Sequence, residues 1–124
     1  MGRIVWEKLS ITTAGANGSA TGNTTTNHPY GGRLVAVGLD FHASAPASTV
    51  VTITEVNGQA RTLFAAPAGA TDITYYPTVQ LCNAIGGALT DVAHVPFHDK
   101  VKATVTLSNA LTACVVAYLY FEVD

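Results

Sequence analysis

Four histidines are the residues whose type best suits metal chemistry, because neutral imidazole is the commonest metal ligand in proteins. They are His28, His42, His94 and His98. His94 and His98 are four positions apart, but Pro96 lies between them, and in a strand they would stand about 13 Å apart. The His-x-His pair with which a cupin-type jelly roll ordinarily binds its metal is also missing. We therefore expect no metal site and no cofactor.

The sequence does not contain a recognisable set of residues for nucleophilic or acid–base catalysis. Asp40 and His42 would form an acid–histidine pair on one strand face, but no Ser or Cys lies in a recognisable nucleophile elbow. Four further acids are scattered singly, unlike the paired carboxylates of glycosidases: Glu55, Asp72, Asp91 and Asp99. Gly31-Gly32 and Gly86-Gly87 lack the lysine and the helix of a phosphate-binding loop. We expect the protein not to be an enzyme.

Aromatic side chains are the remaining candidates for function. We expect four of them to be exposed: Trp6, Tyr30, Tyr75 and Tyr76. On the surface of a β-sheet such side chains anchor a protein interface or stack on sugar rings. The residues that we expect at an interface are Trp6, Asn23, Tyr30, Tyr75, Tyr76, Phe97, Tyr118 and Tyr120.

The composition limits the classes of partner. The chain has 124 residues, the size of one domain, and its 6 Lys or Arg and 8 Asp or Glu give a net charge of −2. Because only 11% of the residues are charged, we expect no nucleic-acid partner. The longest apolar run, residues 113–121, is half the length of a membrane-spanning helix, and Glu7 and Lys8 interrupt any signal-peptide pattern. We therefore expect no membrane partner.

The candidate residues would be positioned by β-strands. Apolar and polar residues alternate with period two along most of the chain, and clusters of turn residues interrupt this alternation. The expected strands cover residues 3–13, 33–42, 50–56, 59–65, 73–81, 92–95, 101–107 and 112–123. The pattern predicts an all-β fold, a single antiparallel β-sandwich of about seven or eight strands over residues 1–124, and leaves jelly-roll and immunoglobulin-like topologies open.

Several local patterns refine this prediction. Residues 14–32, rich in Gly, Asn and Thr, are expected to form a loop or a flexible arm. Asn57-Gly58 predicts a type I′ hairpin turn, and Pro77 predicts an edge strand or a bulge. Residues 101–107 and 112–123 are expected to pair with each other as an antiparallel hairpin.

Two strands have apolar residues at alternate positions. Within residues 33–42 one face is expected to hold Val35, Val37, Leu39 and Phe41. In the last strand one face would hold Cys114, Val116, Tyr118 and Tyr120, and the other Val115, Ala117, Leu119 and Phe121. Because both of these faces are apolar, we expect the core on one and a neighbouring subunit on the other. Cys82 and Cys114 match no zinc or redox spacing, and we expect Cys114 to be a free buried thiol.

The sequence resembles small virion structural proteins of tailed bacteriophages, and the closest class is the capsid cement or decoration proteins. It shares with them the short all-β pattern, the enrichment in Thr, Ala, Gly and Asn, the Gly- and Thr-rich stretch at residues 14–27, and the start at Met1. The resemblance implies a homotrimer that is made in the host cytoplasm, binds the major capsid protein on the capsid surface and reinforces the shell. A charge-poor surface agrees with this role, because burying unpaired charge at an interface is costly.

Two other functions stay open. A carbohydrate-binding module would use Trp6, Tyr30, Tyr75 or Tyr76 as a stacking platform for sugar rings. A jelly-roll enzyme with a histidine site would contain stoichiometric metal. Our expectation is instead a homo-oligomer, a trimer, that binds a viral capsid without catalysis.

Overall fold

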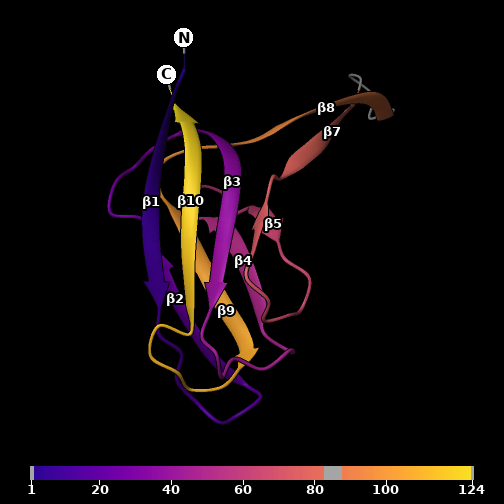
Figure 1. Cartoon of the computed structure of the whole chain (residues 1–124). Helices are drawn as coiled ribbons and strands as arrows, with labels where there is room; N and C mark the ends of the chain where they lie inside the picture. The colour runs from indigo at the N-terminus through magenta and orange to yellow at the C-terminus, as the bar shows by residue number, and fades with distance from the viewer. Residues whose placement is uncertain (1, 83–87, 124) are drawn as a thin grey trace.

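The computed structural model describes residues 2–82 and 88–123, and for residues 79–82 and 88–92 it describes the backbone alone. These residues form ten strands (Figure 1). The strands are β1 (Arg3–Ile11), β2 (Ala20–Thr25), β3 (Gly32–Phe41), β4 (Val50–Glu55), β5 (Thr62–Ala65), β6 (Ile73–Tyr75), β7 (Thr78–Cys82), β8 (Ala88–Phe97), β9 (Val101–Ser108) and β10 (Val115–Val123). Within the described residues no helix is long and apolar enough to span a membrane. The predicted all-β sandwich is confirmed, with more strands than expected.

The strands form two antiparallel sheets that pack face to face (Figure 1). The larger sheet has the order β1-β10-β3-β8-β7, with β6 also pairing with β3, and the smaller has the order β2-β9-β4-β5. Four antiparallel pairs are nested along the chain: β1 with β10, β2 with β9, β3 with β8, and β4 with β5. This nesting is the jelly-roll arrangement, so the structure decides between the two topologies that the sequence left open.

The prediction that β9 and β10 pair with each other as a hairpin is wrong. β9 pairs with β2 and β4 in the smaller sheet, whereas β10 pairs with β1 and β3 in the larger one. The connection between them crosses from one sheet to the other, and Ala113 has a positive φ of 49° just before β10 begins. Alternation identifies a half-buried strand, but it carries no information about which strand lies beside it.

The inner faces of the two sheets form the hydrophobic core. β10 is flanked by strands on both sides. Of its two predicted faces, the core covers the one that carries Val115, Ala117, Leu119 and Phe121, and Val123 is buried with them. The other large buried side chains come from both sheets and include Leu9, Ile11, Leu34, Leu39, Val51, Ile53, Val101 and Val105. The second face of β10 points away from this core.

A bulge changes the predicted faces of β3. Tyr120 pairs with Ala36, but the next residue, Phe121, pairs with Leu34, so β3 has one extra residue at this point. As a result Leu34 is buried in the core and Val35 is not, contrary to the alternation. Beyond the bulge Val37 and Leu39 share a face as predicted; both lie in the core, and Phe41 packs against it.

Cys114 also departs from its predicted face. It precedes β10, is fully buried, and its Sγ lies 3.2 Å from the Oγ of Ser108. It therefore belongs to the core and does not share the outer face of β10 with Val116. Its prediction as a free buried thiol is confirmed, whereas the side chain of Cys82 lies outside the described part of the chain.

The stretch expected to be a loop or arm contains strand β2. Ala20 and Thr26, at either end of this strand, are buried, and the backbone N–H groups of Ala14 and Thr21 donate to each other's carbonyl oxygens. The strand was missed because its exposed positions carry Thr and Asn, the same residues that mark a loop. The loop is thereby reduced to the turn before β2 and the connection that leads into β3.

Two other local expectations change. The connection from β4 to β5 is a loop that runs from Glu55 to Arg61, wider than the two-residue turn predicted at Asn57-Gly58. The strand expected over residues 73–81 is divided into β6 and β7, because Pro77 lies between them. The short strand expected near residues 92–95 is the end of the longer β8.

Candidate functional site

Aromatic side chains gather on the outer face of the larger sheet. The register of β1 with β10 places Trp6 opposite Tyr120 and Lys8 opposite Tyr118. The Trp6 ring centroid lies 6.3 Å from that of Tyr118 and 6.4 Å from that of Tyr120, within the range of favourable aromatic pairs. β1 and β10, which carry these side chains, run side by side in Figure 1.

This aromatic cluster is open to solvent. Trp6 is 58% exposed, Ile4 beside it is 57% exposed, and Tyr76, at the end of β6, is 72% exposed. A depression of about 350 Å³ in the same face is lined by Ile4, Val35, Ala36, Thr74, Tyr76 and Tyr120. We call Ile4, Trp6, Val35, Tyr76, Tyr118 and Tyr120 the outer-face patch. Contiguous exposed apolar surface of this kind marks interaction sites in soluble proteins.

The structure brings together four of the eight residues predicted at an interface, namely Trp6, Tyr76, Tyr118 and Tyr120. Asn23 is exposed, but it lies on β2 in the other sheet. Ile4 and Val35 were not among the predicted residues. Ile4 could have been predicted, because it is two positions from Trp6 and therefore lies on the same face of the strand. The position of Val35 depends on the bulge in β3.

The other three aromatic residues predicted at an interface, Tyr30, Phe97 and Tyr75, pack against other side chains of the protein. Tyr30 stacks on Phe121 with ring centroids 4.8 Å apart, and its hydroxyl donates to Glu7 Oε1. Burial, together with the Glu7 carboxylate, raises the pKa of Tyr30. The Phe97 ring is buried 4.9 Å from that of Phe121. Exposure was correctly predicted for Trp6 and Tyr76, and Tyr30 is only partly exposed.

Tyr75 alternates with Tyr76 and therefore lies on the opposite face of its strand. It pairs with Val37, and its ring centroid is 5.0 Å from that of Phe64 across the sandwich. Tyr75 is thus packed against the core and only partly exposed, contrary to the prediction.

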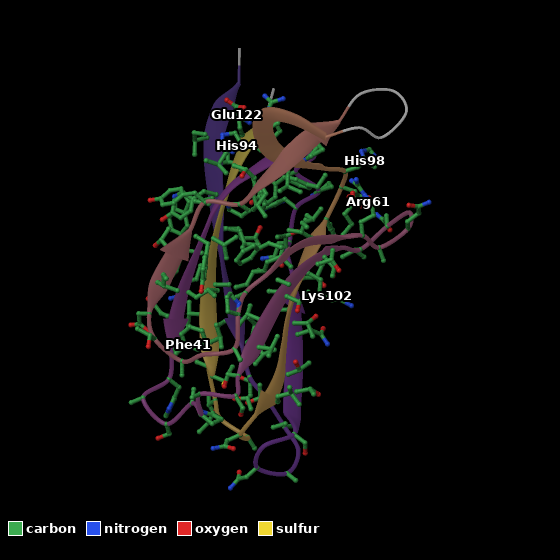
Figure 2. All side chains as sticks on the ribbon, turned by 90° about the vertical axis from the view of Figure 1, so that its right-hand side faces the viewer. Phe41, Arg61, His94, His98, Lys102 and Glu122 are labelled. Atoms are coloured by element: carbon green, nitrogen blue, oxygen red, sulfur yellow. The ribbon has the colours of Figure 1, made fainter. Side chains whose placement is uncertain are left out.

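The histidines and acids are dispersed over the molecule. Among the described residues no three His, Cys, Asp or Glu side chains gather into a group that could hold a metal ion. His42 Nδ1 accepts a hydrogen bond from the backbone of Ser44, and it caps a turn. Figure 2 shows His94 and His98 on separate parts of one end of the molecule.

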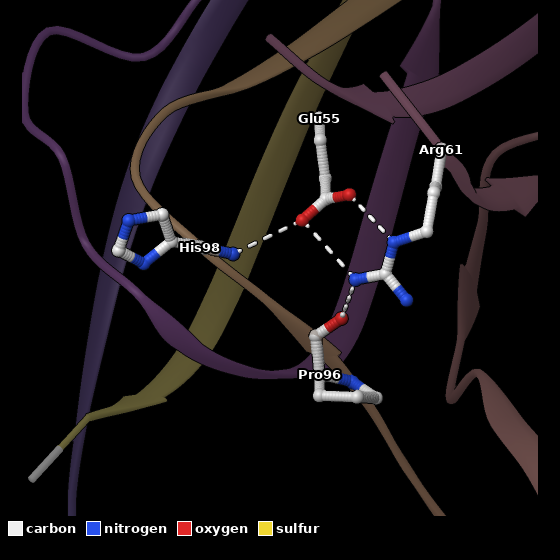
Figure 3. A network of polar contacts seen from close by, with 4 residues as sticks. All are labelled: Glu55, Arg61, Pro96 and His98. Carbon is white, nitrogen blue, oxygen red and sulfur yellow. Dashed lines mark hydrogen bonds and ion pairs between the residues drawn. The ribbon is translucent and has the colours of Figure 1, made fainter. Parts of the chain in front are cut away.

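Glu55 has a buried side chain at the centre of a polar network whose other members, Arg61, Pro96 and His98, are exposed (Figure 3). Its side chain is only 7% exposed; its Oε1 accepts from Arg61 Nε at 2.7 Å and its Oε2 from Arg61 Nη2 at 3.2 Å. The backbone N–H of His98 donates to Glu55 Oε2 at 3.2 Å, and Arg61 Nη2 also donates to the carbonyl of Pro96. The network joins the β4–β5 loop to the end of β8.

The Arg61 hydrogen bonds lower the pKa of Glu55 below its ordinary value of 4.5, burial opposes this shift, and the His98 amide adds to it. A carboxylate with a lowered pKa stabilises the fold above its unfolded-state pKa and loses this effect as the pH falls through the folded pKa. Glu55→Gln should cost about 1.5–3 kcal/mol of unfolding free energy at neutral pH. The difference from wild type should shrink below pH 4.5.

Urea denaturation over a pH series measures this difference. Arg61→Gln serves as the matched variant, and it should be the more destabilising of the two at neutral pH because it leaves the buried carboxylate without its cation. A Glu55→Gln effect that stays constant from neutral to acidic pH would contradict this account of the network.

The outer-face patch is thus the part of the described structure that is best suited to bind something. Comparisons of the chain with protein-family models, with curated proteins and with solved structures find no match. The functional argument therefore rests on the fold and on the chemistry of this patch.

Proposed function

We propose that the chain is a non-enzymatic structural protein of a virion, a decoration protein that binds the major capsid protein and stabilises the shell. The observation that carries this proposal is the outer-face patch. Trp6, Tyr118 and Tyr120 lie on a regular sheet face, where three adjacent aromatic rings offer a rigid surface to a protein partner. Aromatic anchors on rigid elements dominate the binding energy of protein interfaces.

The surface as a whole supports the same proposal. The chain has only 6 Lys or Arg and 8 Asp or Glu, and one of these acids, Glu55, is buried, for an accessible surface of 6796 Å². Few charges would have to be desolvated when such a surface is covered by a neighbour. The jelly roll is a frequent fold of viral capsid proteins, although it also occurs in lectins and cupins, so the fold by itself does not select a function.

A binding experiment tests the proposal. Purified protein is mixed with empty shells of the virus that encodes it, and the mixture is sedimented. The wild-type chain should sediment with the shells and raise their disruption temperature. Trp6→Ala combined with Tyr120→Ala should reduce binding by at least about tenfold, because two aromatic anchors are removed. Val56→Ala, an exposed apolar residue on the β4–β5 loop, is the control and should bind as wild type.

Carbohydrate binding is the second candidate, and one observation favours it. The rings of Trp6 and Tyr120 are stacked, 30° from parallel, on an open sheet face, and aromatic platforms of this kind can stack on sugar rings. A glycan array with the same variants separates the two functions. Carbohydrate binding would replace the decoration proposal if two results were found together. The wild-type chain would bind a glycan and lose this binding with Trp6→Ala, and it would stay in the supernatant when mixed with shells.

A further inference from the structure

Strand β1 forms one edge of the larger sheet. Within the described residues it pairs only with β10, so no strand pairs with its other side. Figure 1 shows β1 as the outermost strand of this sheet, at the left. An edge strand presents unpaired backbone N–H and C=O groups, to which a further strand can be added. The edge of β1 is therefore a candidate for a contact with another chain.

A contact with β2 identifies the residues of β1 that present these groups. The hydroxyl of Thr24, on β2, donates to the carbonyl oxygen of Ser10 at 2.9 Å, so the backbone of Ser10 points away from β10. Because the backbone groups of successive residues point to alternate sides of a strand, Ile4, Trp6 and Lys8 present theirs at the same edge. The side chains of these three residues are exposed as well. An added strand would therefore lie directly beside the outer-face patch.

β1 differs from the other edge strands in its regularity. Proteins protect exposed edges with short strands, prolines, bulges or charges. β1 is nine residues long, contains no proline, and pairs with β10 without an irregularity. At three other edges β2, β5 and β7 each have a register shift in their pairing, and β5 has only four residues. Charged side chains are thus the only one of these protecting features that β1 carries.

The charges of β1 favour one register for pairing two copies. When two antiparallel copies are related by a two-fold axis, the axis passes through the same residue of each strand, because residues with free backbone groups must face one another. An axis at Val5 places Arg3 of each copy opposite Glu7 of the other. An axis at Trp6 would place Arg3 opposite Leu9, and an axis at Glu7 would bring two carboxylates together. Opposite charges on facing residues stabilise a strand pair and like charges destabilise it, so the register centred on Val5 is preferred.

The Glu7 carboxylate can accept such a partner without losing its contacts within the chain. The hydroxyl of Tyr30 donates to Glu7 Oε1, and the backbone N–H of Asn27 donates to Oε2. Each carboxylate oxygen can accept a second hydrogen bond. Glu7 is partly exposed and Arg3 is exposed, so both side chains are accessible to a second copy.

From these observations we propose that two copies of the chain pair through β1, antiparallel about a two-fold axis at Val5, so that their larger sheets join into one. The inference rests on the proposed role of the outer-face patch as an assembly surface, because the same register places Trp6 opposite Ile4 of the second copy and joins the two patches. A contact of this symmetry uses the same surface of both copies and ends at two of them. The oligomer is then a dimer and not the trimer that the resemblance implies.

Exchange of the two charges tests the register. Arg3→Glu alone brings carboxylates together at position 7 of the other copy, and Glu7→Arg alone brings guanidinium groups together. At about 100 µM, at which a dissociation constant in the micromolar range saturates, light scattering should give wild type twice 12.8 kDa and each variant alone 12.8 kDa. An equal mixture should regain the double mass, because every facing pair then joins an arginine to a glutamate. Lys8→Glu, which changes the net charge as much as Arg3→Glu does, is the control and should keep the double mass.

A cysteine on the axis gives a second measurement that does not need Glu7→Arg to fold. Val5→Cys, in a chain that also carries Cys82→Ser, should form an intermolecular disulfide under mild oxidation, because the two facing Cα atoms would be about 4.5 Å apart. Cys114 is fully buried and should not react. Trp6→Cys in the same background is the matched control. Its two Cα atoms would be about 8 Å apart, too far for a disulfide.

Three outcomes overturn the proposal: a wild-type monomer or trimer, folded charge variants whose mixture does not regain the double mass, or a disulfide that forms with Trp6→Cys and not with Val5→Cys. Circular dichroism establishes which variants are folded. The shell experiment is independent of these measurements. A monomer that binds shells would leave the decoration proposal standing and remove this one, whereas a dimer that stays in the supernatant would remove the decoration proposal and leave the β1 contact.

Discussion

Phe121→Ala is expected to reduce the unfolding free energy by about 3–5 kcal/mol, the usual cost of removing a large buried aromatic side chain. Phe121 is fully buried, and its ring lies 4.9 Å from that of Phe97 and 4.8 Å from that of Tyr30. It thereby connects β10, the end of β8 and the loop before β3. Truncation leaves a cavity whose walls are three separate segments of backbone, so they cannot easily collapse into it.

Chemical denaturation with matched variants measures this effect. Phe121→Leu retains most of the volume and should cost clearly less than Phe121→Ala. Trp6→Ala, on the exposed outer face, should leave the stability of the monomer close to that of wild type. A loss below about 1 kcal/mol for Phe121→Ala would show that the packing between the two sheets is looser than the structure indicates.

Among Gly→Ala substitutions, Gly32→Ala is expected to be the most destabilising. It should reduce the unfolding free energy by about 3 kcal/mol, because backbone strain and steric overlap act together. Gly32 begins β3 with a φ of 147°, a conformation that residues with a side chain rarely adopt. A Cβ at this position would also overlap the carbonyl oxygen of Glu122 on the neighbouring strand. The strand pairing that positions Tyr120 would therefore have to shift.

Gly69→Ala provides the control for this substitution. A Cβ at Gly69 would meet open space, and its backbone is not in the left-handed region, so its unfolding free energy should stay within about 0.5 kcal/mol of wild type. Thermal denaturation of the two variants under identical conditions measures the contrast. Equal melting temperatures would contradict the close approach of Gly32 to β10.

The sequence predicted the fold class because alternation is a local property. Alternation identified β9, with Val101, Ala103 and Val105 on its buried face, and it identified β10 as a strand with two apolar faces, of which the structure shows the buried one. The partner of each strand depends on contacts between distant segments, so the jelly-roll order was left open and the β9–β10 hairpin was predicted wrongly. β2 was missed because Thr21 and Asn23, which face outward, are also typical loop residues.

The candidate site could be predicted only in part, for a similar reason. Alternation predicts that Tyr118 and Tyr120 share one face of their strand and that Trp6 lies opposite Val5 and Leu9 on its own. That these two strands are neighbours, with Trp6 opposite Tyr120, follows only from the fold. Tyr30 and Phe97 lie outside the regular alternation and fill space beside Phe121, which only the packing of the two sheets determines. Nor could any sequence pattern show that β1 lies at the edge of the larger sheet.

The central claim is that the outer-face patch is covered when the protein assembles, and the tryptophan in it offers the most direct test. Trp6 is the only tryptophan in the chain, so its fluorescence reports on the patch without any substitution. Acrylamide quenching is measured for the dilute free chain, the concentrated chain and the chain bound to shells. Strong quenching in dilute solution, with protection and a blue-shifted emission on assembly, is the predicted result. Equal quenching in the free and assembled states would show that the patch stays exposed and would contradict the claim.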